Sequence, residues 1–280
     1  MQRRKRISQR LKIFNMKPKI IVLSGYGLNC EEETKYAFEL AGGKGDIVHV
    51  NDLIDGRYNL DNYQILAVPG GFSYGDDTGS GNAYANKLKN HLWKKLTAFI
   101  RKDKLAIGIC NGFQILVNLG LLPALNGNYG KREVALVQNN NKRYTVRWVD
   151  LKIENGTPWF AGIKTISLPI AHGEGEFFAA EKILAQLKNK NLIAARYIKG
   201  EIDNYQSLPV NPNGSLFNIA AVTDESRRIL GMMPHPERAI FFTQLPHWPY
   251  LKEKYLRENK PLPVDGPGLQ IFKNAIIYFS

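Results

Sequence analysis

The sequence predicts an α/β fold whose central, mostly parallel β-sheet is covered by helices on both faces. Short apolar runs alternate with helical patterns through the first half of the chain, and this alternation is typical of a parallel sheet. Strands are expected there at 19–23, 46–50, 64–68 and 105–109, with helices at 29–41, 82–101 and 111–119. The second half is richer in expected strands, at 135–138, 144–153, 167–170, 192–197, 217–222 and 229–233, before a last helix at 269–279.

Length and composition favour one domain. A chain of 280 residues, of which 44% are hydrophobic, can bury one large core. We therefore expect a single three-layer domain over residues 16–280. Residues 1–15 contain six basic residues and no acidic one, and we expect them to form a disordered tail before Met16, which is itself a candidate start.

Charge and cysteine content narrow the class of protein. The net charge of +13 would suit a nucleic-acid-binding protein, but subtracting the six charges of the tail leaves +7, spread without a dominant basic block. Two cysteines are too few for a disulfide framework and favour a reducing cytoplasm. The longest uncharged run, 105–130, contains Gly, Asn, Gln and Pro, so it does not resemble a transmembrane helix.

The segment GICNG puts Cys110 at a sharp turn between an expected strand and an expected helix. Its spacing is that of a nucleophile elbow, which lifts a nucleophile above the sheet and aims backbone N–H groups at a developing oxyanion. The tight turn leaves no room for a side chain at Gly108 or Gly112. Because the helix N-terminus also favours a thiolate, we predict that Cys110 is a nucleophile rather than a buried structural cysteine.

Two histidine–glutamate pairs could supply the base for this nucleophile. One pair is His235 and Glu237, the other is His172 and Glu174, and each follows an expected strand. Residues two apart on extended backbone point the same way, so in either pair the glutamate could hold the tautomer of the histidine. The spacing alone does not choose between the two pairs.

Other motifs give weaker signals. In VPGGFSYGDD, which follows a strand, the Gly71 N–H could be a second oxyanion donor. The first strand is followed by Gly25-x-Gly27, but Cys30 replaces the third glycine of a dinucleotide fingerprint, and we interpret Cys30 as structural. The sequence contains no phosphate-binding loop motif and no zinc-type Cys/His spacing, so we predict neither an ATP site of that kind nor a metal.

Five segments together resemble the class I glutamine amidotransferases: GYGLNC, PGGFSYGDD, GICNGFQIL, PIAHGEGEF and MPHPERA. More narrowly, GGFSYGD and AHGEG resemble the glutaminase subunits of phosphoribosylformylglycinamidine synthases, which act in purine biosynthesis. The resemblance covers roughly residues 18–240 and implies the flavodoxin-like fold of that class.

The resemblance also implies roles for individual residues. It implies a catalytic triad and two backbone oxyanion donors, namely Cys110, His235 and Glu237 with Gly71 and Asn111. It implies a glutamine pocket in or near which lie Gln114, His172 and Glu174. Members of this family need no cofactor of their own. They deliver ammonia to a large synthetase subunit that uses ATP and Mg²⁺, often together with a third, small subunit.

We therefore expect a cytoplasmic glutaminase subunit that hydrolyses glutamine to glutamate and ammonia for such a synthetase. One alternative is a glutaminase or cysteine hydrolase of another pathway, against which GGFSYGD and AHGEG argue. A second is a basic nucleic-acid-binding protein that has lost catalysis, against which the intact Cys–His–Glu set argues.

The sequence departs from the family pattern in two places: the stretch DTGSGNAYANKL after Asp76, and Glu176, where arginine is common. These departures affect the predicted docking surface.

Overall fold

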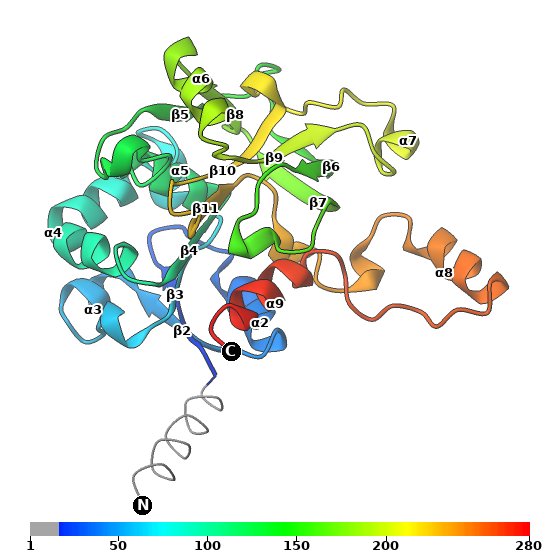
Figure 1. Cartoon of the computed structure of the whole chain (residues 1–280), viewed down its shortest axis with the longest axis horizontal. Coiled ribbons are helices and arrows are strands. Elements are labelled where there is room, and N and C mark those ends of the chain that lie inside the picture. The colour runs from blue at the N-terminus through cyan, green and yellow to red at the C-terminus, as the bar shows by residue number, and fades with distance from the viewer. Residues whose placement is uncertain (1–16) are drawn as a thin grey trace, which may run out of the picture.

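The computed structural model describes residues 17–280 and contains a nine-stranded sheet of mixed direction (Figure 1). The strand order across the sheet is β2-β1-β3-β4-β11-β10-β9-β6-β7. The first five strands are parallel: β1 (Lys19–Ser24), β2 (Lys44–His49), β3 (Ile65–Val68), β4 (Leu105–Ile109) and β11 (Ile229–Met232). Their order is that of a flavodoxin-like doubly wound sheet, which confirms the predicted fold class.

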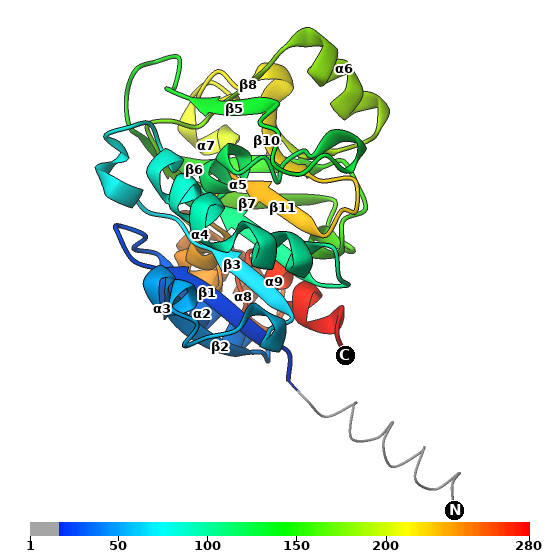
Figure 2. The same ribbon diagram turned by 90° about the vertical axis from the view of Figure 1, so that its left-hand side faces the viewer.

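The other four strands continue the sheet in antiparallel fashion. They are β10 (Ile219–Thr223), β9 (Ile193–Ile198), β6 (Thr145–Ile153) and β7 (Thr165–His172). A separate two-stranded sheet of β5 (Val134–Val137) and β8 (Glu176–Ala179) lies at the end of the molecule away from β2 (Figure 2). Every residue of β4 is buried, whereas burial alternates along β7, because only the parallel part is covered on both faces.

Helices cover both faces of the parallel part. On one face α2 (Glu31–Leu40) packs against α9 (Leu269–Ile277), and on the other α4 (Asn82–Ile100) packs against α5 (Asn111–Asn118) (Figure 1). The shorter helices are α3 (Val50–Ile54), α6 (Glu181–Asn189), α7 (Asp203–Gln206) and α8 (Trp248–Arg257). Single 3₁₀ turns lie at Leu60–Asn62, Ser73–Asp76, Leu125–Gly127, Pro158–Phe160, Leu216–Asn218, Pro236–Arg238 and Phe242–Gln244.

Several elements differ from those expected. Helix α2 begins two residues later than predicted, because the amides of Asn29 and Cys30 donate to the Gly70 carbonyl and keep this segment in a loop. Strand β8 and helices α3, α6, α7 and α8 were not predicted. Helix α8 contains no fully buried residue.

The prediction for residues 1–15 falls outside the described residues, and the division into a tail and one domain stays a prediction. Across residues 17–280 we find no helix that is both long enough and apolar enough to cross a bilayer.

Candidate active site

Cys110 occupies a strained turn between β4 and α5. Its backbone angles are φ +51° and ψ −106°, a conformation that residues with a side chain rarely adopt and that often marks a functional site. A Cβ on Gly112 would lie 1.8 Å from the Val68 carbonyl oxygen, and a Cβ on Gly108 would lie 2.5 Å from the Gly112 carbonyl oxygen. The lack of room that the sequence predicted at both glycines is therefore confirmed.

The strand next to β4 brings His235 to the same edge of the sheet. Strands β4 and β11 are parallel, with Met232 beside Ile109, so the segments that follow them leave the sheet together. The Cys110 N–H donates to the Met232 carbonyl at 2.8 Å, and the His235 N–H donates to the carbonyl of Pro169 on β7 at 2.8 Å. Both side chains are nearly enclosed, with 5% of Cys110 and 2% of His235 exposed.

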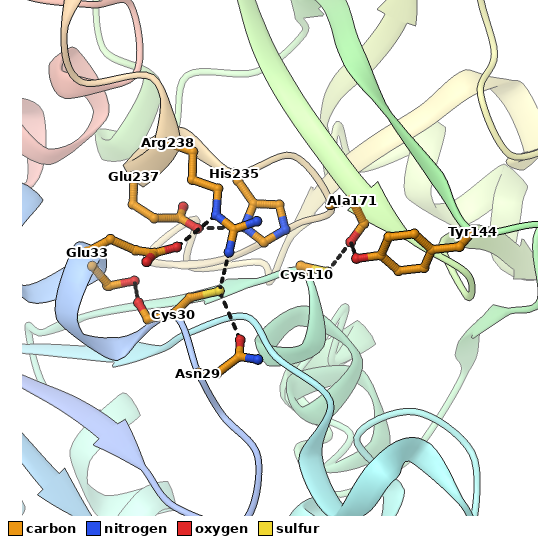
Figure 3. A network of polar contacts seen from close by, with 10 residues as sticks. Asn29, Cys30, Glu33, Cys110, Tyr144, Ala171, His235, Glu237 and Arg238 are labelled. Carbon is orange, nitrogen blue, oxygen red and sulfur yellow. Dashed lines mark hydrogen bonds and ion pairs between the residues drawn. The ribbon is translucent and has the colours of Figure 1, made fainter. Parts of the chain in front are cut away.

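His235 and Glu237 form a close, buried pair (Figure 3). Nδ1 of His235 lies 2.5 Å from Oε1 of Glu237, whose residue is 1% exposed. This bond assigns the ring proton to Nδ1. The other nitrogen, Nε2, is buried and has no hydrogen-bond partner within residues 17–280. Figure 3 shows the ring between Glu237 and Cys110, so the pair can present Nε2 to the thiol.

The surroundings of His235 favour its protonated form. Burial lowers the pKa of His235, but the negative charge of Glu237 and the interaction with Cys110 outweigh this and hold the pKa well above its ordinary value. A histidine that can hold a proton beside a cysteine is what activation of a thiol requires.

The rival pair of His172 and Glu174 does not form a comparable dyad. Nδ1 of His172 lies 3.1 Å from Oδ1 of Asn139, which also accepts a hydrogen bond from the Gly175 N–H at 2.9 Å. The Glu174 carboxylate instead accepts a hydrogen bond from the Ser80 N–H at 3.1 Å. The same sequence spacing therefore gives two different arrangements.

His172 is a neutral histidine next to this site. Burial lowers the pKa of His172 to about 3, and the charge of His235 acts in the same direction. Because the Asn139 side-chain nitrogen donates to the carbonyls of His172 and Arg143, the amide oxygen faces the ring and Nδ1 carries the proton. At neutral pH His172 therefore does not titrate. It lines the site and presents a polar ring edge to it.

The backbone N–H groups of Gly71 and Asn111, predicted as oxyanion donors, take no part in the hydrogen bonds of the bridge or helix to which these residues belong. Gly71 forms a short antiparallel bridge with Leu28, and the hydrogen bonds of this bridge run through the residues on either side, so the Gly71 N–H takes no part in it. Asn111 is the first residue of α5, and first-turn amides have no acceptor within their own helix.

Side-chain amides tie the elbow to its surroundings. Oδ1 of Asn111 accepts from the Ser73 N–H at 3.2 Å, while its Nδ2 donates to Gln114 at 2.8 Å and to Asp76 at 3.3 Å. Gln114 in turn donates to the Glu174 carbonyl at 2.5 Å. Gln114 and Glu174, predicted to be near the glutamine pocket, are therefore in contact. The contact between the Asn111 side chain and Asp76 was not predicted from the sequence, because only the fold brings these residues together.

Cys30, which the sequence suggested was structural, lies beside His235 and Glu237. Its Sγ, a His235 ring nitrogen and a Glu237 oxygen lie within 4.8 Å of one another. These groups are metal ligands by type, but the His235 and Glu237 atoms already bond to each other, and Nη2 of Arg238 lies 3.1 Å from the Cys30 Sγ. The guanidinium charge would oppose a cation, so we do not assign a metal site here.

Two exposed aromatic rings lie near Cys110. Phe72 is 44% exposed and Tyr144 is 51% exposed, and their ring centroids are 5.9 Å apart. The Tyr144 hydroxyl donates to the Ala171 carbonyl at 3.0 Å, the same oxygen that Cys110 Sγ approaches at 3.7 Å (Figure 3). Tyr144 was expected only as the first residue of a strand, because it is the fold that brings its ring close to Cys110.

Comparison with known proteins defines the class. The model of the CobB/CobQ-like glutamine amidotransferase domain matches residues 17–279. The chain therefore belongs to this family, as its fold and the predicted motifs indicated.

Individual relatives identify a narrower group. The phosphoribosylformylglycinamidine synthase subunit PurQ of Methanococcus maripaludis (strain C5) is 48% identical over 268 residues, which are 95% of this chain and 100% of the relative. PurQ of Dehalococcoides mccartyi is 38% identical and matches 93% of this chain and 97% of its own length. In the structure of PurLQS from Thermotoga maritima, one chain superimposes with a TM-score of 0.69 at 30% identity, covering 95% of this chain and 100% of that one.

The crowding at Gly112 in the elbow leads to a testable prediction about the stability of the protein. In Gly112→Ala the new methyl group meets the Val68 carbonyl, which belongs to a buried strand and cannot move away easily. We expect the free energy of unfolding to fall by about 1–3 kcal/mol, measured by urea denaturation. Gly156→Ala is the control, because the nearest atom to its Cβ would be 3.9 Å away. Equal stability of the two variants would contradict this account of the turn.

The lowered pKa of His172 leads to a prediction about how the stability of the protein depends on pH. Its pKa is about 3 in the folded chain against an ordinary value of 6.5, so between these values the unfolded chain binds a proton that the folded chain does not. Stability should therefore fall as the pH is lowered from 6.5, with a contribution of up to about 1.4 kcal/mol per pH unit. In His172→Gln we expect this slope, measured by urea unfolding between pH 4.5 and 6.5, to be smaller by about one proton. The control variant is His91→Gln, at an exposed position, and its slope should be much closer to that of the unaltered chain. Equal slopes in all three proteins would exclude the role of His172 in the pH dependence of stability.

Proposed function

We propose that Cys110, His235 and Glu237 are the nucleophile, the base and the orienting group with which this chain hydrolyses glutamine. The chain is the glutaminase subunit of a phosphoribosylformylglycinamidine synthase in purine biosynthesis, associated with the synthetase subunit, as its PurQ relatives and the PurLQS structure indicate. The observation that carries the residue assignment is the buried contact of 2.5 Å between His235 and Glu237 next to the elbow cysteine.

The reaction follows from this arrangement. The Cys110 thiolate attacks the side-chain amide carbon of glutamine, and the carbonyl becomes an oxyanion. We assign the Gly71 and Asn111 N–H groups as donors of hydrogen bonds to that oxyanion, and each is expected to contribute about 10²–10³ in rate. His235 gives its proton to the leaving ammonia, and a thioester to Cys110 remains. His235 then takes a proton from water, which hydrolyses the thioester and releases glutamate.

We further propose that the ATP and Mg²⁺ of the overall reaction bind to the synthetase subunit, and that this chain supplies only ammonia. The sequence of the chain has no phosphate-binding loop motif to suggest otherwise. Free hydrolysis of glutamine would waste it, so we expect low activity until the synthetase and its substrate are present. A cytoplasmic location is part of the proposal, because the two free thiols, Cys30 and Cys110, need a reducing compartment.

The choice between the two histidines can be tested directly. His235→Ala should lower the glutaminase kcat of the assembled synthase by about 10³-fold or more, because loss of the base disables the nucleophile with it. His172→Ala should cause a much smaller fall, since its ring is neutral and is not paired with Glu174. Circular dichroism checks that both variants fold. A larger loss in a folded His172→Ala than in His235→Ala would reverse the assignment.

The division of labour is tested with two nitrogen sources. Cys110→Ala removes the thiol but leaves a residue that is smaller than cysteine and fits the same turn. Synthesis of formylglycinamidine ribonucleotide by the assembled enzyme should stop with glutamine and continue with ammonium salt. Loss of both activities in an intact complex would show that this chain does more than release ammonia, and retained use of glutamine would exclude Cys110 as the nucleophile.

A further inference from the structure

Arg238 lies immediately after the catalytic glutamate and is held at both sides of its guanidinium group (Figure 3). Its Nε donates to Oε1 of Glu33 at 2.7 Å, and its Nη2 lies 3.1 Å from Sγ of Cys30. Glu33 belongs to the first turn of α2, and Cys30 precedes that helix. The side chain therefore connects the turn that carries His235 and Glu237 to a separate element of the fold.

A surface ion pair alone does not account for this arrangement. The side chains of Arg238 and Glu33 are 41% and 37% exposed, and exposed pairs contribute little to stability. The inner end of the guanidinium, however, contacts a thiol that is only 1% exposed. A contact between a charge and a buried thiol next to the active site calls for a second explanation.

Cys30 transmits the contact to the catalytic ring. A Cβ on Gly70 would lie 2.8 Å from Cε1 of His235 and 3.1 Å from Sγ of Cys30, so the missing side chain lets ring and thiol approach each other. Burial raises the pKa of Cys30, so this thiol is neutral when the enzyme works. The positive charge beside this thiol is that of Arg238.

Titratable groups face His235 from several elements. They are Cys110 after β4, Cys30 before α2, His172 at the end of β7, Tyr144 before β6, and Glu237 on its own segment. Arg238, which follows Glu237, interacts with Cys30, Glu33 and Glu237. His172 is neutral, and Glu237 supplies a negative charge. Arg238 supplies a fixed positive charge that opposes Glu237, and Glu33 partly neutralises Arg238.

We propose that Arg238, held by Glu33 and Cys30, is a positioning residue whose charge sets the pH range in which the Cys110–His235 pair is active. The proposal rests on the triad assigned above. The two apparent pKa values of such a coupled pair bound the active range. A nearby positive charge lowers both values, because it disfavours protonated histidine and favours the thiolate. Without it, the whole pH profile moves to higher pH.

The test is the pH dependence of glutaminase kcat/KM in the assembled synthase. Arg238→Gln should move both limbs of the profile upward by about half a pH unit, whereas Arg238→Lys, which keeps the charge, should leave them in place. Glu33→Gln should move both limbs downward, because it leaves the Arg238 charge unopposed. Arg57→Gln, which breaks an ion pair of 2.7 Å with Asp52 on α3, is the matched control and should leave the profile unchanged.

The outcomes separate this inference from the triad assignment. Synthesis with ammonium salt, measured over the same pH range, reports any pH effect that originates in the synthetase. A fixed profile in Arg238→Gln, or equal shifts in the Gln and Lys variants, would overturn the role of the charge while Cys110→Ala and His235→Ala remain inactive. If Arg238→Gln does not fold, Glu33→Gln decides alone, and an unmoved or upward-shifted profile overturns the proposal. Activity in Cys110→Ala would instead refute the triad itself.

Discussion

The parallel pairing of β4 with β11 is the contact on which the active site depends. Gly108 and Gly231 are partners in this pairing, so at that level neither strand has a side chain. A Cβ on Gly231 would lie 2.1 Å from Phe113, and one on Gly108 would lie 2.5 Å from the carbonyl of Gly112, both on α5. The two glycines thus let α5 pack directly on the sheet. The packing of α5 on the sheet sets the position of Cys110 at the sheet edge, and the pairing of β4 with β11 places His235 beside it.

Burial makes the polar groups of the site depend on one another. A buried carboxylate is costly without a partner, and Glu237 has one in His235, whose backbone is in turn bonded to β7. Gly70 leaves room for the His235 ring and for Cys30 behind it. The proposed catalytic geometry is therefore shared among four segments, namely those after β1, β3, β4 and β11. Each of them follows the carboxyl end of a parallel strand, where ligands bind in such sheets.

The sequence predicted the parallel part of the fold well, because strands buried on both faces are continuous apolar runs, as in 105–109. The elbow was also predictable, since Gly108 and Gly112 reflect a local steric constraint. The spacing to a glutamate alone did not choose between His235 and His172; the family resemblance favoured His235, and tertiary contacts show how differently the two pairs are held. The places of Cys30 and Arg238 could not be predicted either: they are 208 positions apart in the chain and meet through the fold.

The central claim is that glutamine reacts with Cys110 and not with the nearby Cys30. The most direct measurement is peptide mass spectrometry after the assembled enzyme has reacted with an electrophilic glutamine analogue such as a diazoketone, with and without an excess of glutamine. Both thiols are free, so each can report. The account predicts a stable adduct on Cys110 that appears as activity is lost and that glutamine prevents. Modification of Cys30 in step with inactivation, or inactivation while Cys110 stays unmodified, would contradict it.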